Sequence, residues 1–294
     1  MVLVRCAIAG SLILGCAIGA ARADEASAFA AIHPILEATL ADTGAPGDAL
    51  LIGDGARPLH SETAGTASLD TPINISIRTD LAQPTILLAL VDAGFMSLDD
   101  PVKTYLSSAK DDALGTETIR QLMIERADDG AAADRAANSL TLVAESATGW
   151  AWDPLFKQWM ATPLHMQASS YTKSGNALQT SPRDYARLLA MLVQRPMHGA
   201  KTSPTPASDL IFRSQIIGAA SCARQDETAL CNLVERDGVG FYAWIDRARG
   251  LYGVFAAPGA ETSIAKRGRE IRAVAEAAYD REQAGEGLTS AINN

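Results

Sequence analysis

The chain has 294 residues, of which 48% are hydrophobic and 20% are charged, and its formal net charge is −9. This length and apolar content can bury a sizeable core, and they fit one large domain or one domain with an inserted subdomain. The negative charge, without any basic stripe along the sequence, argues against nucleic-acid binding.

Residues 1–23 have the pattern of a secretory signal peptide. An arginine precedes an apolar stretch, and residues 21–23 read Ala-Arg-Ala before an acidic pair. The pattern predicts cleavage after Ala23 and a periplasmic or secreted mature protein. A lipoprotein site at Cys16 is the second interpretation, because Leu14 is bulkier than the small residue expected there. No later segment reaches the ~18 to 20 apolar residues that cross a bilayer, so the mature protein is expected to have no transmembrane segment.

Two cysteines remain once the signal peptide is removed. They are Cys222 and Cys231, and in an oxidising compartment the expected pairing is a disulfide between them. A zinc site would need two more ligands at suitable spacing, and the four histidines are scattered singly along the chain. The sequence therefore predicts no metal and no other cofactor.

Helical and strand patterns occupy different parts of the chain. Apolar residues recur at helical spacing over 27–40, and two strands, 49–52 and 59–64, follow around a turn. Strand patterns return at 241–245 and 251–256, before a last helix. That helix carries on one face Ile271, Val274 and Ala278. Between these parts the pattern is helical, over 86–91, 119–124, 140–147, 155–160 and 185–193.

This order of elements predicts a single α/β (α+β) domain over residues 24–294. The two ends of the chain, about 24–76 and 216–294, meet in one antiparallel sheet with flanking helices. An all-helical subdomain, about 77–215, is inserted between them.

Several short phrases lie in order over nearly the whole mature chain. They are Ala45-Pro46-Gly47, Ala64-Gly65-Thr66-Ala67, Leu90-Val91-Asp92-Ala93-Gly94, Leu98-Asp99-Asp100-Pro101-Val102, Pro163-Leu164-His165-Met166, the run from Thr180 to Arg187, and Tyr242-Ala243-Trp244-Ile245-Asp246. With the element order, they resemble the serine β-lactamase and D-alanyl-D-alanine peptidase family, the penicillin-recognising serine hydrolases. The resemblance implies a β-lactamase-like fold and a divergent member of that family, which usually has glycine at the position of His165.

The first catalytic box of that family is Ser-x-x-Lys at the start of a buried helix, where the lysine takes a proton from the attacking serine. The family's helix length, counted back from Gly94, puts the serine at Ile77 and the lysine at Asp80. A shift of one residue brings in Ser76 but leaves a threonine in place of the amine. Because Pro84 removes a helical hydrogen bond, the helix is expected to begin later than in active relatives.

The other two boxes also lack the expected side chains. The second, Ser/Tyr-x-Asn, falls on Ala127-Asp128-Asp129 by class A spacing or on Ala132-Ala133-Asp134 by class C spacing, and alanine replaces the hydroxyl in both. The third, Lys/His-x-Gly, falls on Glu235-Arg236-Asp237, where an acid replaces the base. The resemblance thus predicts an acid-lined cleft that prefers neutral or cationic ligands.

Literal matches to the boxes occur elsewhere. Ser107 stands three residues before Lys110, and Ser170 stands three before Lys173, followed by Ser174-Gly175-Asn176. These fragments lie in polar stretches, so Ser76, Ser107 and Ser170 are only weak alternatives as nucleophiles. His165 is interpreted as a surface or packing residue and not as a base. Trp150, Trp152 and Trp159 are interpreted as core anchors of a helix and not as a platform for a sugar.

Two functions follow from these patterns. The preferred one is a catalytically degenerate exported protein that binds an unknown small molecule or cell-envelope component, because three boxes are lost while the phrases between them persist. The alternative is an active serine hydrolase of β-lactamase, carboxypeptidase or esterase type with a divergent site.

Overall fold

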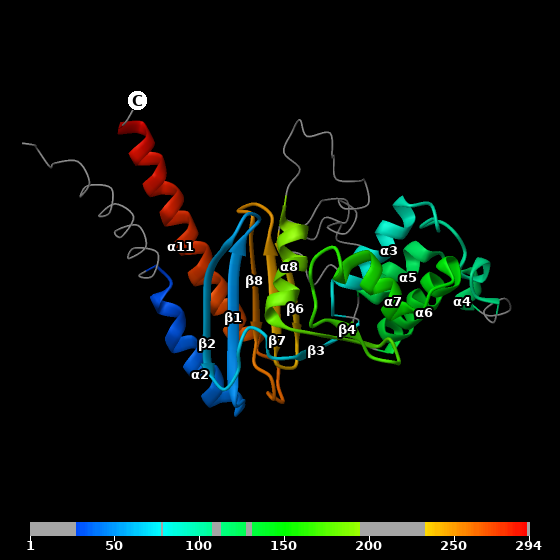
Figure 1. The fold of residues 1–294 in the computed structure, drawn as a ribbon, viewed down its shortest axis with the longest axis horizontal. Helices are drawn as coiled ribbons and strands as arrows, with labels where there is room; N and C mark the ends of the chain where they lie inside the picture. The colour runs from blue at the N-terminus through cyan, green and yellow to red at the C-terminus, as the bar shows by residue number, and fades with distance from the viewer. Residues whose placement is uncertain (1–27, 78, 108–112, 128–130, 195–232, 293–294) are drawn as a thin grey trace, which may run out of the picture.

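The main sheet of the protein is built from both ends of the chain. The structure is a computed structural model that describes residues 28–77, 79–107, 113–127, 131–194 and 233–292. Within them, five antiparallel strands follow the order β2-β1-β8-β7-β6 (Figure 1). The strands are β1 (Gly47–Asp54), β2 (Pro58–Gly65), β6 (Leu233–Gly238), β7 (Phe241–Asp246) and β8 (Leu251–Ala256). This is the antiparallel sheet that the sequence pattern predicts.

Helices from the two ends of the chain cover one face of this sheet. They are η1 (Ala30–Ile32), α2 (His33–Thr43) and α11 (Ala265–Ile292), which lie next to each other in Figure 1. Alternate residues of β1 serve the two faces: Leu50 and Ile52 pack beneath these helices, whereas Leu51 packs toward the rest of the molecule. Because β1 is covered on both faces, the four residues 49–52 in its middle form a continuous apolar run.

The described residues between β2 and β6 are mainly helical. Their helices are α3 (Ala82–Asp92), η2 (Val102–Thr104), α4 (Ala113–Thr116), α5 (Ile119–Arg126), α6 (Ala131–Thr148), α7 (Trp152–Phe156), the π-helical turn η4 (Lys157–Ala161) and α8 (Pro182–Val193). Of these, α8 returns to the main sheet and packs on β1 and β8. The others form the subdomain on the right of Figure 1.

A second sheet joins the two parts, and the sequence pattern did not predict it. Its order is β3 (Ile73–Ser76), β5 (Ala177–Thr180) and β4 (Ser170–Tyr171). These strands have two to four residues, too few for a period-two pattern to stand out from the helical segments around them.

Two other predictions concern residues that the structure does not describe. Residues 1–23, with the signal peptide, and the pair Cys222 and Cys231 lie outside the described ranges. Within those ranges, no helix is both long enough and apolar enough to cross a membrane.

His165 has an unusual backbone conformation. Its φ is +56°, and no other non-glycine residue of the described chain has a positive φ. A side chain in this left-handed region clashes with the backbone, at a cost of about 1 to 2 kcal/mol. The imidazole is exposed, while the carbonyl accepts a hydrogen bond from the Arg187 guanidinium at 2.5 Å. The turn thus keeps the shape that glycine would adopt without strain.

Asp48 is a buried acid on β1. Its side chain is fully buried on the face under α2, and neither carboxylate oxygen has a hydrogen-bond partner in the described part of the chain. Burial raises the pKa of Asp48 to about 7; the nearby backbone of Ala64 opposes this shift, and the Glu62 carboxylate adds to it. The native protein therefore holds a proton at Asp48 that the unfolded chain releases near pH 4.

We expect His165→Gly to raise the free energy of unfolding by about 0.5 to 1 kcal/mol, because glycine relieves the strain but increases the entropy of the unfolded chain. Urea unfolding would measure this gain. The matched control is His165→Ala, which keeps a Cβ and should give no gain. Equal stabilisation by both variants would show that the imidazole, rather than the backbone, causes the strain.

We expect the stability of the wild-type protein to fall between about pH 4 and pH 7, because the native state then binds one more proton than the unfolded state. Asp48→Asn should remove this part of the decline and be more stable than wild type at pH 8 by about 1 to 3 kcal/mol. Urea unfolding at pH 5 and pH 8 tests it, with the exposed Asp92→Asn as control. If Asp48→Asn had the same free energy of unfolding as the wild type at both pH values, the pKa of Asp48 would not be raised.

Candidate functional site

The mapped serine position is an apolar core residue. Ile77 directly follows β3, is only 2% exposed, and belongs to the main hydrophobic cluster. The helix α3 begins at Ala82, after both mapped positions of the first box, as the sequence predicts. Pro84 is the third residue of α3, where a backbone N–H has no intrahelical partner to lose. The proline is therefore compatible with a helix that starts late.

The mapped lysine position carries a buried carboxylate that caps α3. Asp80 is fully buried, and its Oδ1 accepts hydrogen bonds from the backbone N–H groups of Ala82 at 2.5 Å and Gln83 at 3.0 Å. Its Oδ2 accepts a hydrogen bond from the Tyr171 hydroxyl at 3.0 Å. Asp80 thus satisfies N–H groups at the start of the helix, the usual task of an N-cap side chain.

Arg126, the last residue of α5, is the counter-charge at this site. Its fully buried Nη2 donates to the backbone carbonyls of Ile77 at 2.7 Å and Asp80 at 2.5 Å, and its Nε donates to Gln83 Oε1 at 2.6 Å. The Gln83 amide in turn donates to the Ala137 carbonyl and to the Thr141 hydroxyl on α6. One guanidinium therefore connects the turn after β3 with α3, α5 and α6.

We call Asp80, Gln83, Arg126, Tyr171, Tyr185 and Arg236 the buried polar cluster. Burial raises the pKa of Asp80 and lowers that of Arg126, while their mutual attraction opposes both shifts. The pKa of Tyr171 lies well above its usual range, and burial also raises that of Tyr185, whose hydroxyl accepts a hydrogen bond from the Leu81 N–H at 3.0 Å. Neither hydroxyl is thus made more acidic, which activation as a nucleophile would require.

The positions mapped to the second box supply no hydroxyl. Ala127 caps α5 next to Arg126, and Asp128 and Asp129 lie outside the described residues. Ala132 and Asp134 are both exposed in the first turn of α6. By class C spacing, the two positions that should carry the hydroxyl and the amide of the second box therefore face solvent.

The third box requires a correction. Glu235 pairs with Trp244 and lies on the α11 side of the sheet, where it accepts a hydrogen bond from the Tyr242 hydroxyl and is 3.5 Å from Arg272. Arg236 instead lies on the side of the helical subdomain, close to Arg126 and Asp80. Burial and then the Arg126 charge lower the pKa of Arg236 to about 10.

These positions do not form the predicted acidic cleft. Asp237 and Asp134 are exposed, Glu235 faces away from Asp80, and two arginines accompany Asp80. The alternation of side chains along β6 would have indicated which residue faces the helical subdomain. Val234 and Arg236 are two residues apart and therefore point to the same face of the sheet, and the buried Val234 belongs to the main hydrophobic cluster on that face.

The weak alternative serines lie at different places on the molecule. Ser76 is exposed on β3, and Ser107 is exposed while Lys110 lies outside the described residues. Ser170 lies in β4 at intermediate exposure, and Lys173 is exposed in the following turn. The Ser174 hydroxyl donates to Asn176 Oδ1 at 2.6 Å, so this literal second box closes a tight turn between β4 and β5.

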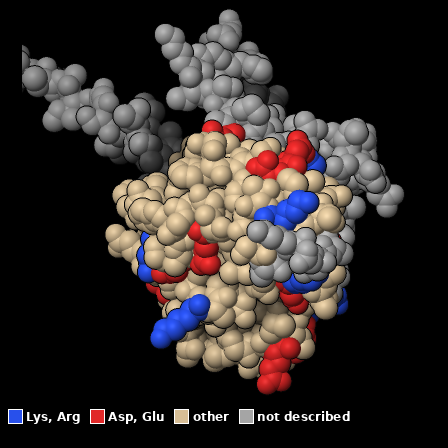
Figure 2. All heavy atoms as spheres, turned by 90° about the vertical axis from the view of Figure 1, so that its right-hand side faces the viewer, with Lys and Arg blue, Asp and Glu red and all other residues tan. Residues whose placement is uncertain are grey.

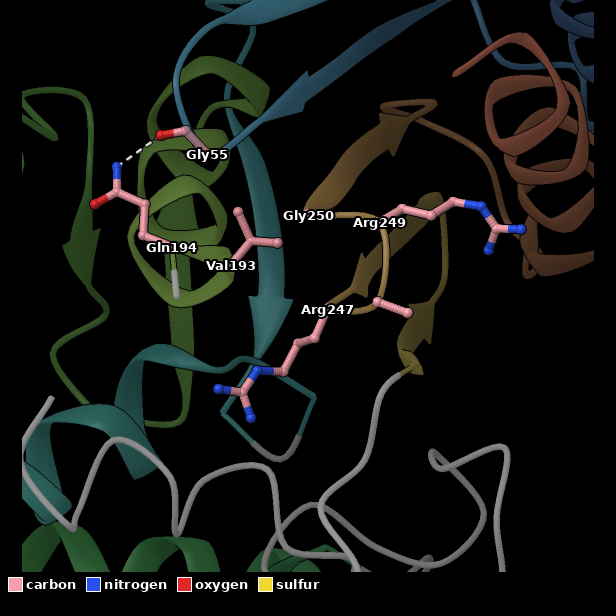
Figure 3. A pocket seen from close by; sticks show the side chains of 7 residues that line it. Gly55, Val193, Gln194, Arg247, Arg249 and Gly250 are labelled. Atoms are coloured by element: carbon pink, nitrogen blue, oxygen red, sulfur yellow. Dashed lines mark hydrogen bonds between the residues drawn. The ribbon is translucent and has the colours of Figure 1, made fainter. Parts of the chain in front are cut away.

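A surface pocket lined by described residues lies at the β7–β8 turn, away from the buried polar cluster. Its volume is about 420 Å³, and it includes Arg247 and Arg249 (Figure 3). Arg249 is directed toward α11 and pairs with Asp246 at 2.7 Å and Asp280 at 2.9 Å, so its charge is neutralised. Within the described ranges, no three His, Cys, Asp or Glu side chains are grouped to hold a metal ion.

The sheet, the covering helices and the inserted helical subdomain define the fold of the serine β-lactamases and penicillin-binding proteins. Three solved structures illustrate the similarity. A β-lactamase candidate from Bacteroides dorei is 21% identical with a TM-score of 0.65, covering 78% of this chain and 90% of that one. Simvastatin synthase from Aspergillus terreus is 14% identical with a TM-score of 0.65, covering 94% and 100%.

The third is a D-alanine carboxypeptidase from Burkholderia cenocepacia, 14% identical with a TM-score of 0.61, covering 87% of this chain and 99% of that one. No protein-family model and no curated protein matches the sequence. The similarity therefore concerns the fold.

We expect Arg126→Met to lower the free energy of unfolding by about 3 to 5 kcal/mol, because it leaves Asp80 buried without a counter-charge. Combining it with Asp80→Asn should cost less than the sum of the two single changes. Urea unfolding of the three variants tests the coupling, with Arg135→Met as control for an exposed ion pair worth at most about 1 kcal/mol. Strict additivity would show that Asp80 and Arg126 do not act as a unit.

Proposed function

We propose that the chain is an exported, catalytically inactive member of the penicillin-recognising family, with a binding or scaffold role in the cell envelope. One observation carries this proposal: a buried isoleucine and a buried, hydrogen-bonded aspartate occupy the mapped serine and lysine positions. The fold supports membership of the family, and the signal-peptide pattern of residues 1–23 supports export.

The chemistry of acyl transfer explains why this observation matters. The reaction needs a hydroxyl that attacks a carbonyl and a neighbouring base that accepts its proton. Ile77 offers no hydroxyl, and the carboxylate of Asp80 is already occupied by three hydrogen bonds. The groups around it hold the helices together and are not directed at a substrate.

The active serine hydrolase is the competing proposal. In its favour, the fold is shared by a D-alanine carboxypeptidase, by simvastatin synthase and by a hydrolase with promiscuous acyltransferase activity. It requires a nucleophile other than Ile77, for which Ser76, Ser107 and Ser170 are the candidates.

Intact-mass spectrometry of protein produced with its leader in a Gram-negative host tests both parts of the proposal. We expect a chain that begins at Asp24 and gains no mass with a penicillin or a fluorophosphonate, because no activated hydroxyl is present. The double variant Ile77→Ser with Asp80→Lys should also remain unlabelled, since Arg126 and Arg236 would then repel the new lysine.

An active carboxypeptidase treated in parallel controls for probe quality. A stoichiometric adduct on the unmodified chain would establish the active hydrolase, and the labelled peptide would name its serine. An uncleaved leader, or a lipid on Cys16, would replace the predicted cleavage after Ala23.

A further inference from the structure

Of the three tryptophans of the helical subdomain, Trp150 is not the core anchor that the sequence predicts, and Trp159 packs only partly buried against the main hydrophobic cluster. Trp152 is buried at 2% exposure, as the sequence predicts, but Trp150 is 50% exposed and Trp159 is only partly buried. Phe95, near the end of α3, is 44% exposed and meets Trp159 edge to face, with 5.9 Å between ring centroids. Exposed aromatic rings in such numbers indicate a contact surface.

These rings line a pocket of about 510 Å³, which we call the aromatic pocket. Its volume lies within the range of small-molecule sites, about 300 to 1,000 Å³. Its lining consists of Phe95, Thr148, Trp150, Leu155, Gln158, Trp159 and Pro163.

The backbone holds the aromatic pocket in an unusual way. Gly149, with a φ of +74°, ends α6 and leads the chain out to Trp150. Gln158 and Trp159 lie in the π-helical turn η4, which the Thr162 N–H closes on the Lys157 carbonyl at 2.9 Å. Single π-helical turns occur frequently at functional sites.

The lining excludes charged ligands. None of its seven side chains is ionisable, although one residue in five of the whole chain is charged. Charged side chains on the end of the molecule formed by the helical subdomain are scattered among broad uncharged areas (Figure 2). A charged ligand buried here would lose hydration without gaining a counter-charge.

The polar group of the aromatic pocket is the amide of Gln158. It is exposed and forms no hydrogen bond with other described residues, whereas the Thr148 hydroxyl already donates to the Ala144 carbonyl. An amide carries donors and an acceptor together, and so does an acetamido group. The apolar C–H face of a pyranose ring fits the electron-rich face of an indole.

We propose that the aromatic pocket binds an uncharged N-acetylated hexosamine unit. Trp150 and Trp159 stack on the sugar ring, and Gln158 pairs with its acetamido group. The site is separate from the buried polar cluster, so this proposal goes beyond the proposed function and does not depend on whether the chain is catalytic.

Isothermal calorimetry with triacetylchitotriose tests the proposal on the mature chain. We expect saturable binding, about tenfold weaker for cellotriose, which lacks the acetamido groups. Trp150→Ala should weaken triacetylchitotriose binding by about tenfold or more, and Gln158→Leu should remove the preference between the two sugars. The control is Leu142→Ala, which removes a side chain that is 52% exposed on α6 but does not line the aromatic pocket.

Trp150 and Gln158 are exposed, so both variants should unfold like the wild type, and urea unfolding would verify this. Absence of saturable binding at millimolar sugar would overturn the proposal, as would wild-type affinity in Trp150→Ala. Binding to phosphatidylcholine vesicles that requires Trp150, without sugar binding, would also overturn it and assign the surface to membrane contact. None of these results bears on labelling by penicillin.

Discussion

The buried pair of Arg126 and Asp80 is the interaction on which the arrangement of the helical subdomain depends. A guanidinium removed from water must find acceptors, and this one takes two carbonyls from the turn after β3 and one from the Gln83 amide. Asp80 meanwhile fixes the start of α3 and holds Tyr171 of the second sheet. Charges that cost much to bury are tolerated because each satisfies several backbone groups at once.

The two positions that the family's spacing assigns to the first catalytic box, Ile77 and Asp80, contribute their backbone carbonyls to this cluster. A catalytic lysine must lose and regain a proton, so its surroundings leave it partly unsatisfied. Here the side chains of Asp80, Gln83, Tyr171 and Tyr185 all have hydrogen-bond partners among the residues described, and the buried nitrogens of the cluster without one are Arg126 Nη1 and Arg236 Nε. The hydrogen bonds of the cluster thus hold the turn after β3 and three helices together within a β-lactamase-like fold.

The sequence predicted the framework well and the site only in part. Long periodic segments such as β1, β7, β8 and α11 were found because burial on one or two faces leaves a clear pattern. The displaced start of α3 followed from Pro84. The role of Arg126 could not be foreseen, since an arginine after an apolar helix usually reaches solvent, and its partners Ile77 and Gln83 are brought close only by the fold. The spacing of the catalytic boxes assigned Glu235 to the cleft, whereas the alternation of side chains along β6 places Arg236 there.

The pairing of β1 with β8 joins residues near the two ends of the chain, as in the register of Leu51 with Val254. One edge of β1 is paired by β2, but the other therefore waits for β8 until almost the entire polypeptide is available. Until then β1 presents an unpaired, strongly apolar edge, which is the kind of strand that aggregates with others. A shortened chain that ends before Leu251 would leave this edge permanently open, so truncation from the C-terminus should damage solubility well before it removes any residue of the helical subdomain.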